Sequence, residues 1–223
     1  MNVLWAGKKM KNIDLMIFDF DGTLVNSGGD IASAVNYTLK YFNIPTMENS
    51  QIILYIGDGV QKLIEKSIGA HRQHLFGDAL KIFSEYYAEH MLDTTALCDS
   101  VIEVLELYKN KKKIIITNKR KHYTVAMADG LGISKYFDEI IGADSTPYKK
   151  PNPLLLTPIL AKFNIRYGNT VVIGDGINDI MLAINTGVLS CALLNGLTQR
   201  QELLALHPDF ACEGLSELIN IFI

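Results

Sequence analysis

The chain has 223 residues, of which 48% are hydrophobic, and a formal net charge of −3 at pH 7. This length allows one large domain or one domain with an insert, and the hydrophobic fraction suffices for a buried core. The small negative charge argues against a general nucleic-acid-binding protein, which is usually basic, and no apolar stretch approaches the length of a membrane span.

The N-terminal segment carries no sign of export. Residues 1–11 lack the apolar core of a signal peptide, which argues against secretion. We expect residues 1–9 to be a loose lead-in, and either Met1 or Met10 to be the native start.

The cysteines and histidines do not form a recognisable metal or disulfide pattern. Cys98, Cys191 and Cys212 include no C-x-x-C pair and are typical of reduced thiols in a cytoplasmic protein. His71 and His74 could share one helical face, but we expect that face to be solvated rather than metal-binding.

An apolar run at residues 13–18 predicts the first strand, buried on both faces of a parallel sheet. Asp19 ends this run and Asp21 follows two residues later, so both carboxylates point the same way if the chain stays extended. Gly22 then permits a sharp turn. Open α/β sheets bind ligands beyond the carboxyl ends of their strands, so the pair is a candidate reacting centre. Two carboxylates this close repel each other, which predicts a divalent cation with oxygen ligands.

The next segment, residues 30–92, contains helical patterns and no strong strand candidate. Asp30 is a candidate N-cap for a helix that ends before Pro45. Two more helices are expected at residues 60–68 and 80–91, where apolar residues recur at helical spacing. This block between the first and second strands predicts an inserted all-helical cap.

Strands and helices alternate after residue 97. We expect strands at 113–116, 137–142, 170–173, 189–194 and 210–211, and helices at 100–110, 123–131, 177–185, 199–206 and 215–222. The helix near Pro153 either kinks at Pro158 or begins at Thr157 as its N-cap.

This alternation predicts right-handed crossovers and an α/β fold with a doubly wound, Rossmann-like parallel sheet. We expect residues 12–24 and 96–223 to form the catalytic core and residues 25–95 the helical cap domain. The competing interpretation is a nucleotide-binding Rossmann domain. It needs G-x-G-x-x-G after the first strand, and no such pattern occurs between Asp19 and Asp30.

Four segments, in this order, resemble the motifs of the haloacid dehalogenase-like hydrolases. They are residues 19–24 (DFDGTL), 114–118 (IIITN), 149–153 (KKPNP) and 171–179 (VVIGDGIND). Three of them lie at the ends of predicted strands, and the resemblance extends over residues 13–223. It implies the same doubly wound core with an inserted cap.

The resemblance also implies catalytic roles for the acidic residues. Asp19 is expected to be a nucleophile that forms an aspartyl-phosphate, and Asp21 the general acid–base. The family's dehalogenase branch lacks an acid at the position of Asp21, so phosphoryl transfer is favoured over carbon–halogen cleavage. Asp19, the main-chain carbonyl of Asp21 and Asp175 are expected to hold Mg²⁺. Asp179 is expected to support this site, although a carboxylate there also suits the first turn of a helix.

The transferring phosphoryl group is expected to contact Thr117, Asn118 and Lys150. The resemblance implies that Thr117 offers its hydroxyl, Asn118 an amide, and Lys150 a positive charge shared with the Asp19 carboxylate. Lys150 is the lysine directly before Pro151 and therefore the one that matches the motif.

Residues 24–34 and 55–63 resemble the phosphoglycolate phosphatase branch of this family. That branch implies a small phosphorylated metabolite as substrate, with phosphoglycolate as the first candidate, and a cap that excludes water on closing. Gly57 and Gly59 either let the cap backbone approach the substrate or form a turn between helices.

Other functions stay open at this point. A sugar-phosphate mutase and a pyrophosphatase of the same superfamily are alternatives, although such mutases commonly carry a hydrophobic residue where Thr23 stands. A non-catalytic Mg²⁺-binding interaction protein is the alternative from a different class. We expect no nucleic-acid or membrane partner, and a monomer or homodimer in the cytoplasm.

Overall fold

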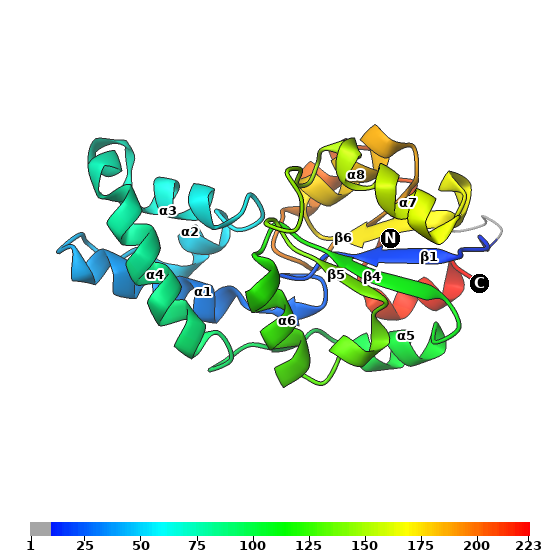
Figure 1. The fold of residues 1–223 in the computed structure, drawn as a ribbon, viewed down its shortest axis with the longest axis horizontal. Helices are drawn as coiled ribbons and strands as arrows, with labels where there is room; N and C mark the ends of the chain where they lie inside the picture. Colours follow the sequence, from blue (N-terminus) through cyan, green and yellow to red (C-terminus); the bar gives the residue numbers. More distant parts are fainter. Residues whose placement is uncertain (1–9) are drawn as a thin grey trace.

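The computed structural model describes residues 10–223, which form a six-stranded parallel sheet with helices on both faces (Figure 1). The strand order is β5-β4-β1-β6-β7-β8. These strands are β1 (Leu15–Phe18), β4 (Lys112–Ile116), β5 (Glu139–Ile141), β6 (Thr170–Gly174), β7 (Leu189–Leu193) and β8 (Phe210–Cys212). The predicted doubly wound α/β class is confirmed. The predicted lead-in, residues 1–9, lies outside the described residues.

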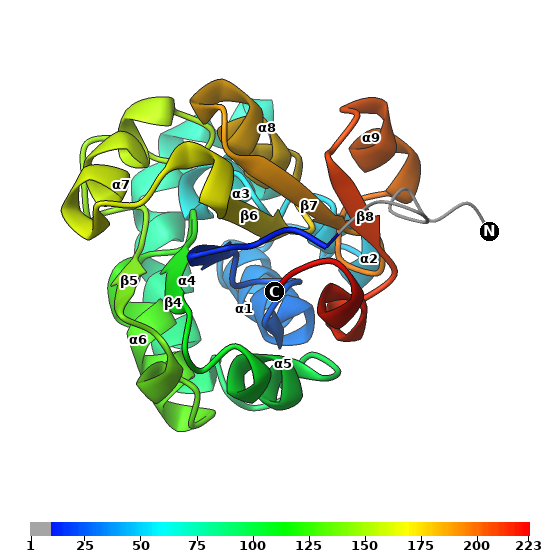
Figure 2. The same cartoon turned by 90° about the vertical axis from the view of Figure 1, so that its right-hand side faces the viewer.

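Strand β1 is buried on both faces because it lies near the centre of the sheet, between β4 and β6. Met16 and Phe18 pack into one apolar cluster, whereas Leu15 and Ile17 pack into another on the opposite face. This division follows from the alternation of side chains along a strand. Figure 2 shows the helices that cover the two faces.

The helices of the core are short. They are α5 (Val101–Leu107), α6 (Lys121–Gly130), α7 (Thr157–Phe163), α8 (Ile177–Thr186) and α9 (Arg200–Ala205). Helix α7 begins at Thr157 with Pro158 in its first turn, where a missing N–H costs nothing, and Leu156 rather than Thr157 is the N-cap. The predicted helix at 215–222 is instead the 3₁₀ segment η5 (Leu215–Asn220). In the described part of the chain, no helix is long and apolar enough to cross a bilayer.

Four α-helices lie to one side of the sheet and share an apolar core of their own. They are α1 (Gly28–Tyr41), α2 (Asn49–Ile53), α3 (Val60–Ile68) and α4 (Phe76–His90), with the 3₁₀ segment η1 (Ala70–Leu75) between the last two. The five-residue α2 is too short to show helical periodicity in the sequence. His71 and His74 are exposed on η1. The domain boundaries at residues 24 and 96 stay a prediction.

A short antiparallel ribbon joins the two places where the chain passes between sheet and cap. Its strands are β2 (Val25–Asn26) and β3 (Ala96–Leu97), and the pattern analysis missed both because two residues carry no periodicity.

The carboxylate of Asp30 connects helix α1 with the segment that leads back from the cap to the sheet. The prediction that Asp30 is the N-cap of this helix is wrong. Helix α1 begins at Gly28, so Asp30 lies within the first turn, 2% exposed. Its carboxylate accepts hydrogen bonds from the main-chain amides and hydroxyls of Thr94 and Thr95, at 2.5 to 3.1 Å. Burial acts to raise the pKa of Asp30, but these hydrogen bonds outweigh it and hold the pKa below its ordinary value of 3.8.

Replacing this carboxylate should therefore weaken the fold in a pH-dependent way. We expect Asp30→Asn to lower the free energy of unfolding by about 1–3 kcal/mol at pH 7, because an amide cannot accept all these donors. Because the folded-state pKa is lowered, the ionised Asp30 carboxylate contributes its full stabilisation above pH 3.8. This stabilisation is lost as the pH falls through the folded-state pKa. Urea unfolding at pH 7 and near pH 3 measures both effects.

Asp93→Asn is the matched control, since the Asp93 side chain is 58% exposed and pairs with His90. It should change the free energy of unfolding by less than about 0.5 kcal/mol. A difference between wild type and Asp30→Asn that is equally large at both pH values would contradict the assignment.

Candidate active site

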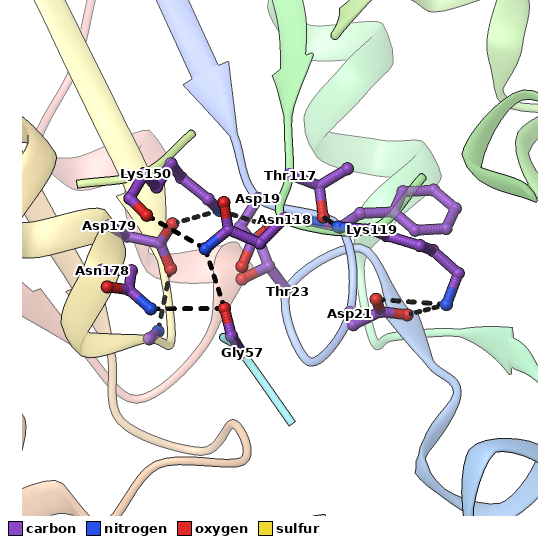
Figure 3. Close-up of polar contacts among 12 residues, drawn as sticks. Asp19, Asp21, Thr23, Gly57, Thr117, Asn118, Lys119, Lys150, Asn178 and Asp179 are labelled. Atoms are coloured by element: carbon purple, nitrogen blue, oxygen red, sulfur yellow. Dashed lines mark hydrogen bonds and ion pairs between the residues drawn. The ribbon is translucent and has the colours of Figure 1, made fainter. Parts of the chain in front are cut away.

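Three polar residues follow directly after three neighbouring strands. Asp19 follows β1, Thr117 follows β4 and Asp175 follows β6, and these strands lie side by side in the order β4-β1-β6. The carboxyl ends of parallel strands meet at one edge of the sheet, so residues far apart in the sequence converge there. Lys150 joins them from the loop after β5, and Asp179 joins from the first turn of α8 (Figure 3).

The centre of the site is a cluster of carboxylates. Asp19, Asp175 and Asp179 each place an oxygen within 4.8 Å of the others. Burial raises the pKa of Asp175 to about 6, with a further contribution from the charge of Asp19. The same two causes raise the pKa of Asp179 well above its ordinary range. The cluster therefore carries an excess of negative charge and has the hard oxygen donors that a divalent cation prefers.

Lys150 compensates part of this negative charge. Its ammonium lies 2.7 Å from Asp19 Oδ1 and 2.6 Å from Asp179 Oδ1, and the residue is only 3% exposed. Burial acts to lower the pKa of Lys150, but the carboxylates of Asp179 and Asp19 outweigh it and raise the pKa. Asp179 also accepts a hydrogen bond from the main-chain amide of Gly176 at 2.9 Å. Both oxygens of Asp179 are thus engaged by the protein.

Asp175 is held by the loops around it. The Thr23 hydroxyl donates to Oδ1 at 2.6 Å, and the Leu197 amide donates to Oδ2 at 2.7 Å. A Cβ at Gly22 or Gly196 would lie only 2.2 or 2.1 Å from the Asp175 side chain. Only glycine lets the two loops pack against this carboxylate, and Gly22 also adopts a φ of +86°.

Asp21 lies beside this cluster but faces a different partner (Figure 3). The chain leaves the strand conformation after Phe18, so the expected alignment of the Asp19 and Asp21 side chains does not extend this far. The Asp21 carboxylate instead pairs with Lys119, at 2.9 and 3.2 Å, and accepts a hydrogen bond from the Ser27 hydroxyl.

Lys119 is the functional candidate that the sequence analysis missed. Its ammonium also donates to the Tyr87 hydroxyl at 2.7 Å, and its side chain is 7% exposed. Burial acts to lower the pKa of Lys119, but Asp21 and Tyr87 outweigh it and raise the pKa. Its place two residues after Thr117, in the turn that follows a strand, is a signal that could have identified it.

Thr117 and Asn118 occupy this same turn and are both buried. Thr117 accepts a hydrogen bond from the Lys119 amide at 3.1 Å. The Asn118 side chain donates to the Gly57 carbonyl at 2.9 Å and to the Lys150 carbonyl at 3.2 Å. Its side chain therefore connects the cap loop with the core, and only its main-chain amide stays a candidate for binding phosphate.

The cap loop at residues 57–59 is held by several core side chains. The Asn178 amide donates to the Gly57 carbonyl at 3.3 Å and to the Asp58 carboxylate at 3.0 Å. Lys149 donates to the Asp58 carbonyl at 3.4 Å. Gly57 and Gly59 have φ values of +117° and +90°, and a Cβ at Gly59 would lie 3.1 Å from the Asn118 carbonyl. The loop therefore approaches the core closely at Gly59, whereas a Cβ at Gly57 would meet no atom within 4 Å; approach of these glycines to a substrate stays a prediction.

A cavity lies between this cap loop and the ends of the strands. The volume of this cavity is about 80 Å³. Its core side is polar and includes Asp19, Asp21, Thr117 and Asp175, whereas its cap side is mostly apolar. The apolar wall consists of Ile31, Ile56, Val60, Leu63 and Phe83. The site thus combines a polar, acidic floor with a mostly apolar roof.

Comparison with known proteins agrees with this geometry. Residues 16–193 match the family model described as haloacid dehalogenase-like hydrolase. The chain is 32% identical to a phosphoglycolate phosphatase of Colwellia psychrerythraea over 220 residues, which cover 95% of this chain and 97% of that protein. It is 30% identical to a phosphoglycolate phosphatase of Vibrio parahaemolyticus, with 95% and 96% covered.

The fold comparison leads to the same group. The crystal structure of a predicted phosphoglycolate phosphatase from Haemophilus somnus superposes with a TM-score of 0.88 at 27% identity, covering 95% of this chain and 99% of that one. A haloacid dehalogenase-like family hydrolase from Streptococcus pneumoniae superposes with a TM-score of 0.84 at 25% identity, with 93% and 97% covered.

The contacts of the cap loop yield a prediction that does not depend on catalysis. Asn178→Ala removes two hydrogen bonds to residues 57 and 58, so the loop should open more often. We expect the loop's amide hydrogens to exchange roughly 2–10-fold faster, the effect of losing about one net hydrogen bond. Hydrogen–deuterium exchange read by mass spectrometry measures this.

Asn185→Ala is the control variant. Asn185 also lies on α8, but its amide donates to the Pro151 carbonyl, away from the cap loop. Exchange at residues 57–60 should match wild type in this variant. Unchanged exchange in Asn178→Ala would mean that the contact does not hold the loop.

Proposed function

The chain belongs to the haloacid dehalogenase-like hydrolases, and we propose that it is a Mg²⁺-dependent phosphatase that hydrolyses a small phosphomonoester through an aspartyl-phosphate. The names of its relatives make 2-phosphoglycolate the first substrate candidate. One observation carries the proposal: Asp19, with Lys150 bound to one oxygen, lies on the floor of a cavity that Thr117 and Asp21 also line.

Asp19 is the proposed nucleophile. Its Oδ1 accepts from Lys150 and from the Phe20 amide, both at 2.7 Å, whereas Oδ2 accepts no hydrogen bond from residues 10–223. These two contacts orient the carboxylate. Attack on phosphorus forms a P–O bond to Asp19 and breaks the ester bond, so that the leaving group departs as an alkoxide. Hydrolysis of the aspartyl-phosphate by water then releases phosphate and restores Asp19.

Asp21 is the proposed general acid–base. It would give its proton to the departing alkoxide and then accept a proton from the attacking water, a contribution typically worth roughly 10²–10⁴-fold in rate. Lys119 and the Ser27 hydroxyl hold its carboxylate at the cavity wall. Lys119 is therefore a positioning residue for this acid.

The donor set fits Mg²⁺. Asp19 and Asp175, together with the main-chain carbonyl of Asp21, would supply hard oxygen ligands, and the raised pKa of Asp175 reflects its burial and the nearby charge of Asp19. Bound there, the metal would supply positive charge that screens the anionic phosphate from the attacking carboxylate. Asp179 would act through Lys150 and Gly176, which already occupy its oxygens, and thereby support the metal ligands.

Lys150 and the turn at residues 117–118 would bind the transferring phosphoryl group. Lys150 supplies a fixed, buried positive charge next to the attacking oxygen, where electrostatic stabilisation is strongest. Thr117 contributes its hydroxyl, and Asn118 its main-chain amide. We expect a monomer or homodimer in the cytoplasm that acts on a small phosphorylated metabolite.

The covalent mechanism predicts the behaviour of Asp19→Asn. Wild type should hydrolyse p-nitrophenyl phosphate with Mg²⁺, stop when EDTA is added and recover when Mg²⁺ is restored. Asp19→Asn should lose activity by roughly a thousandfold or more, because an amide is a poor nucleophile and a weaker metal ligand. Steady-state release of p-nitrophenol measures both.

Asp14→Asn is the matched control, since Asp14 lies just before the opposite end of β1 and binds the Asn169 side chain. It should keep wild-type activity. Wild-type rates in Asp19→Asn would exclude the covalent mechanism. A folded wild type without any turnover in the presence of Mg²⁺ would favour the non-catalytic alternative.

The acid role of Asp21 predicts a dependence on the leaving group. Asp21→Asn should slow hydrolysis of an alkyl ester such as 2-phosphoglycolate by roughly 10²–10⁴-fold, because its alkoxide needs a proton. p-Nitrophenolate needs little protonation, so kcat/KM for p-nitrophenyl phosphate, which reports the steps up to formation of the aspartyl-phosphate, should fall by less than about tenfold. Equal losses of kcat/KM on the two substrates would contradict the role of Asp21 as the acid.

A further inference from the structure

Two cationic residues from the turn after β4, Lys119 and Arg120, line the cavity, and their side chains differ in their partners. Lys119 is neutralised by both oxygens of Asp21. Arg120 is half-buried, and its side chain makes no hydrogen bond or ion pair with any residue between 10 and 223. A guanidinium that is partly withdrawn from water without a partner is poised to bind an anion.

The position of Arg120 relates it to the proposed reaction. It lies three residues after Thr117, directly before the start of α6, so one turn carries both the proposed phosphoryl ligand and this free cation. Arg120 lines the catalytic cavity and also a second cavity of about 360 Å³, which lies between the cap loop at residues 57–59 and the core. An anion bound by Arg120 would therefore lie toward the cap, on the leaving-group side of the site.

The rest of the cap side offers little to a polyhydroxylated leaving group. Its wall is mostly apolar, with Ile56, Val60 and Leu63 among its residues. The Tyr87 hydroxyl is engaged by Lys119 at 2.7 Å, and the Tyr123 hydroxyl donates to the Ser84 carbonyl at 2.9 Å. Sugar hydroxyls buried against this wall would lose hydrogen bonds to water without replacement, which is costly. A short carbon unit that ends in an anion matches both the apolar wall and Arg120.

We propose that Arg120 binds a carboxylate on the leaving group, so that the substrates of this site are phosphate esters of short hydroxy acids. The inference rests on the proposed phosphatase function. A carboxylate is favoured because its two oxygens match the planar fork of the guanidinium in a bidentate pair. Arg120 is thus a specificity-determining residue, whereas the chemical step belongs to Asp19 and Asp21.

The test compares 2-phosphoglycolate with 2-phosphoglycolamide, an ester of nearly the same shape in which an uncharged amide replaces the carboxylate. Wild type should prefer the carboxylate by at least about tenfold in kcat/KM, the ratio that measures discrimination. Arg120→Gln should lower kcat/KM for 2-phosphoglycolate by roughly 10–100-fold, because this ester loses a charged hydrogen bond. The kcat/KM for 2-phosphoglycolamide should change by less than about threefold, since it makes no such bond. Arg120→Lys should retain part of the preference, since it keeps the charge without the fork.

Lys121→Gln is the matched control. It removes the same charge from the next residue, which is exposed and does not line the catalytic cavity, so the preference should stay as in wild type. Equal losses on both esters in Arg120→Gln, or an unchanged preference, would overturn the role of Arg120. Better turnover of ethanediol bisphosphate than of 2-phosphoglycolate would overturn the assignment to a carboxylate in favour of a second phosphate. Wild type that hydrolyses neither these esters nor p-nitrophenyl phosphate would overturn the phosphatase function itself.

Discussion

Crowding of three carboxylates at the ends of adjacent strands is the constraint on which this site depends. Asp19, Asp175 and Asp179 lie close enough to repel, and burial adds to the cost of their charges. Lys150 bridges two of them from a buried position, and this bridge fixes the orientation of Asp19. The negative charge that Lys150 leaves uncompensated makes the cluster suitable for a divalent cation.

A second ion pair holds Asp21, the proposed acid, apart from Asp19, the proposed nucleophile. Asp21 is held by Lys119, which is itself held by Tyr87 of α4, so a cap residue helps to set the position of a core carboxylate. The cap loop at residues 57–59 is fastened to the core by Asn118 and Asn178. The cap is therefore linked to the site at two places, namely the loop at residues 57–59 and the contact of Tyr87 with Lys119. We expect these contacts to couple any movement of the cap to the geometry of the site.

Much of this architecture was predictable because it follows from local pattern. The buried run before Asp19 and the strand before Asp175 are continuous apolar segments, and such segments end where a parallel sheet meets its ligands. The partners of Lys119 and Asp30 were not predictable in this way. Both are charged residues whose partners, Asp21 and Thr94–Thr95, come from distant parts of the sequence. From its local sequence alone, Asp30 fits the role of a helix N-cap. Its actual partners are brought to it only where the folded chain passes between cap and core.

The sequence by itself determined the fold class, the family and the identity of the acidic residues, because these depend on short segments whose hydrophobicity and residue types are local properties. The tertiary structure alone decided which charges meet. It paired Lys150 with Asp19 and Asp179, turned Asp21 toward Lys119 and left Arg120 without an anionic partner among the described residues. The physical reason is that electrostatic interaction depends on distance and burial in space, and separation along the chain specifies neither.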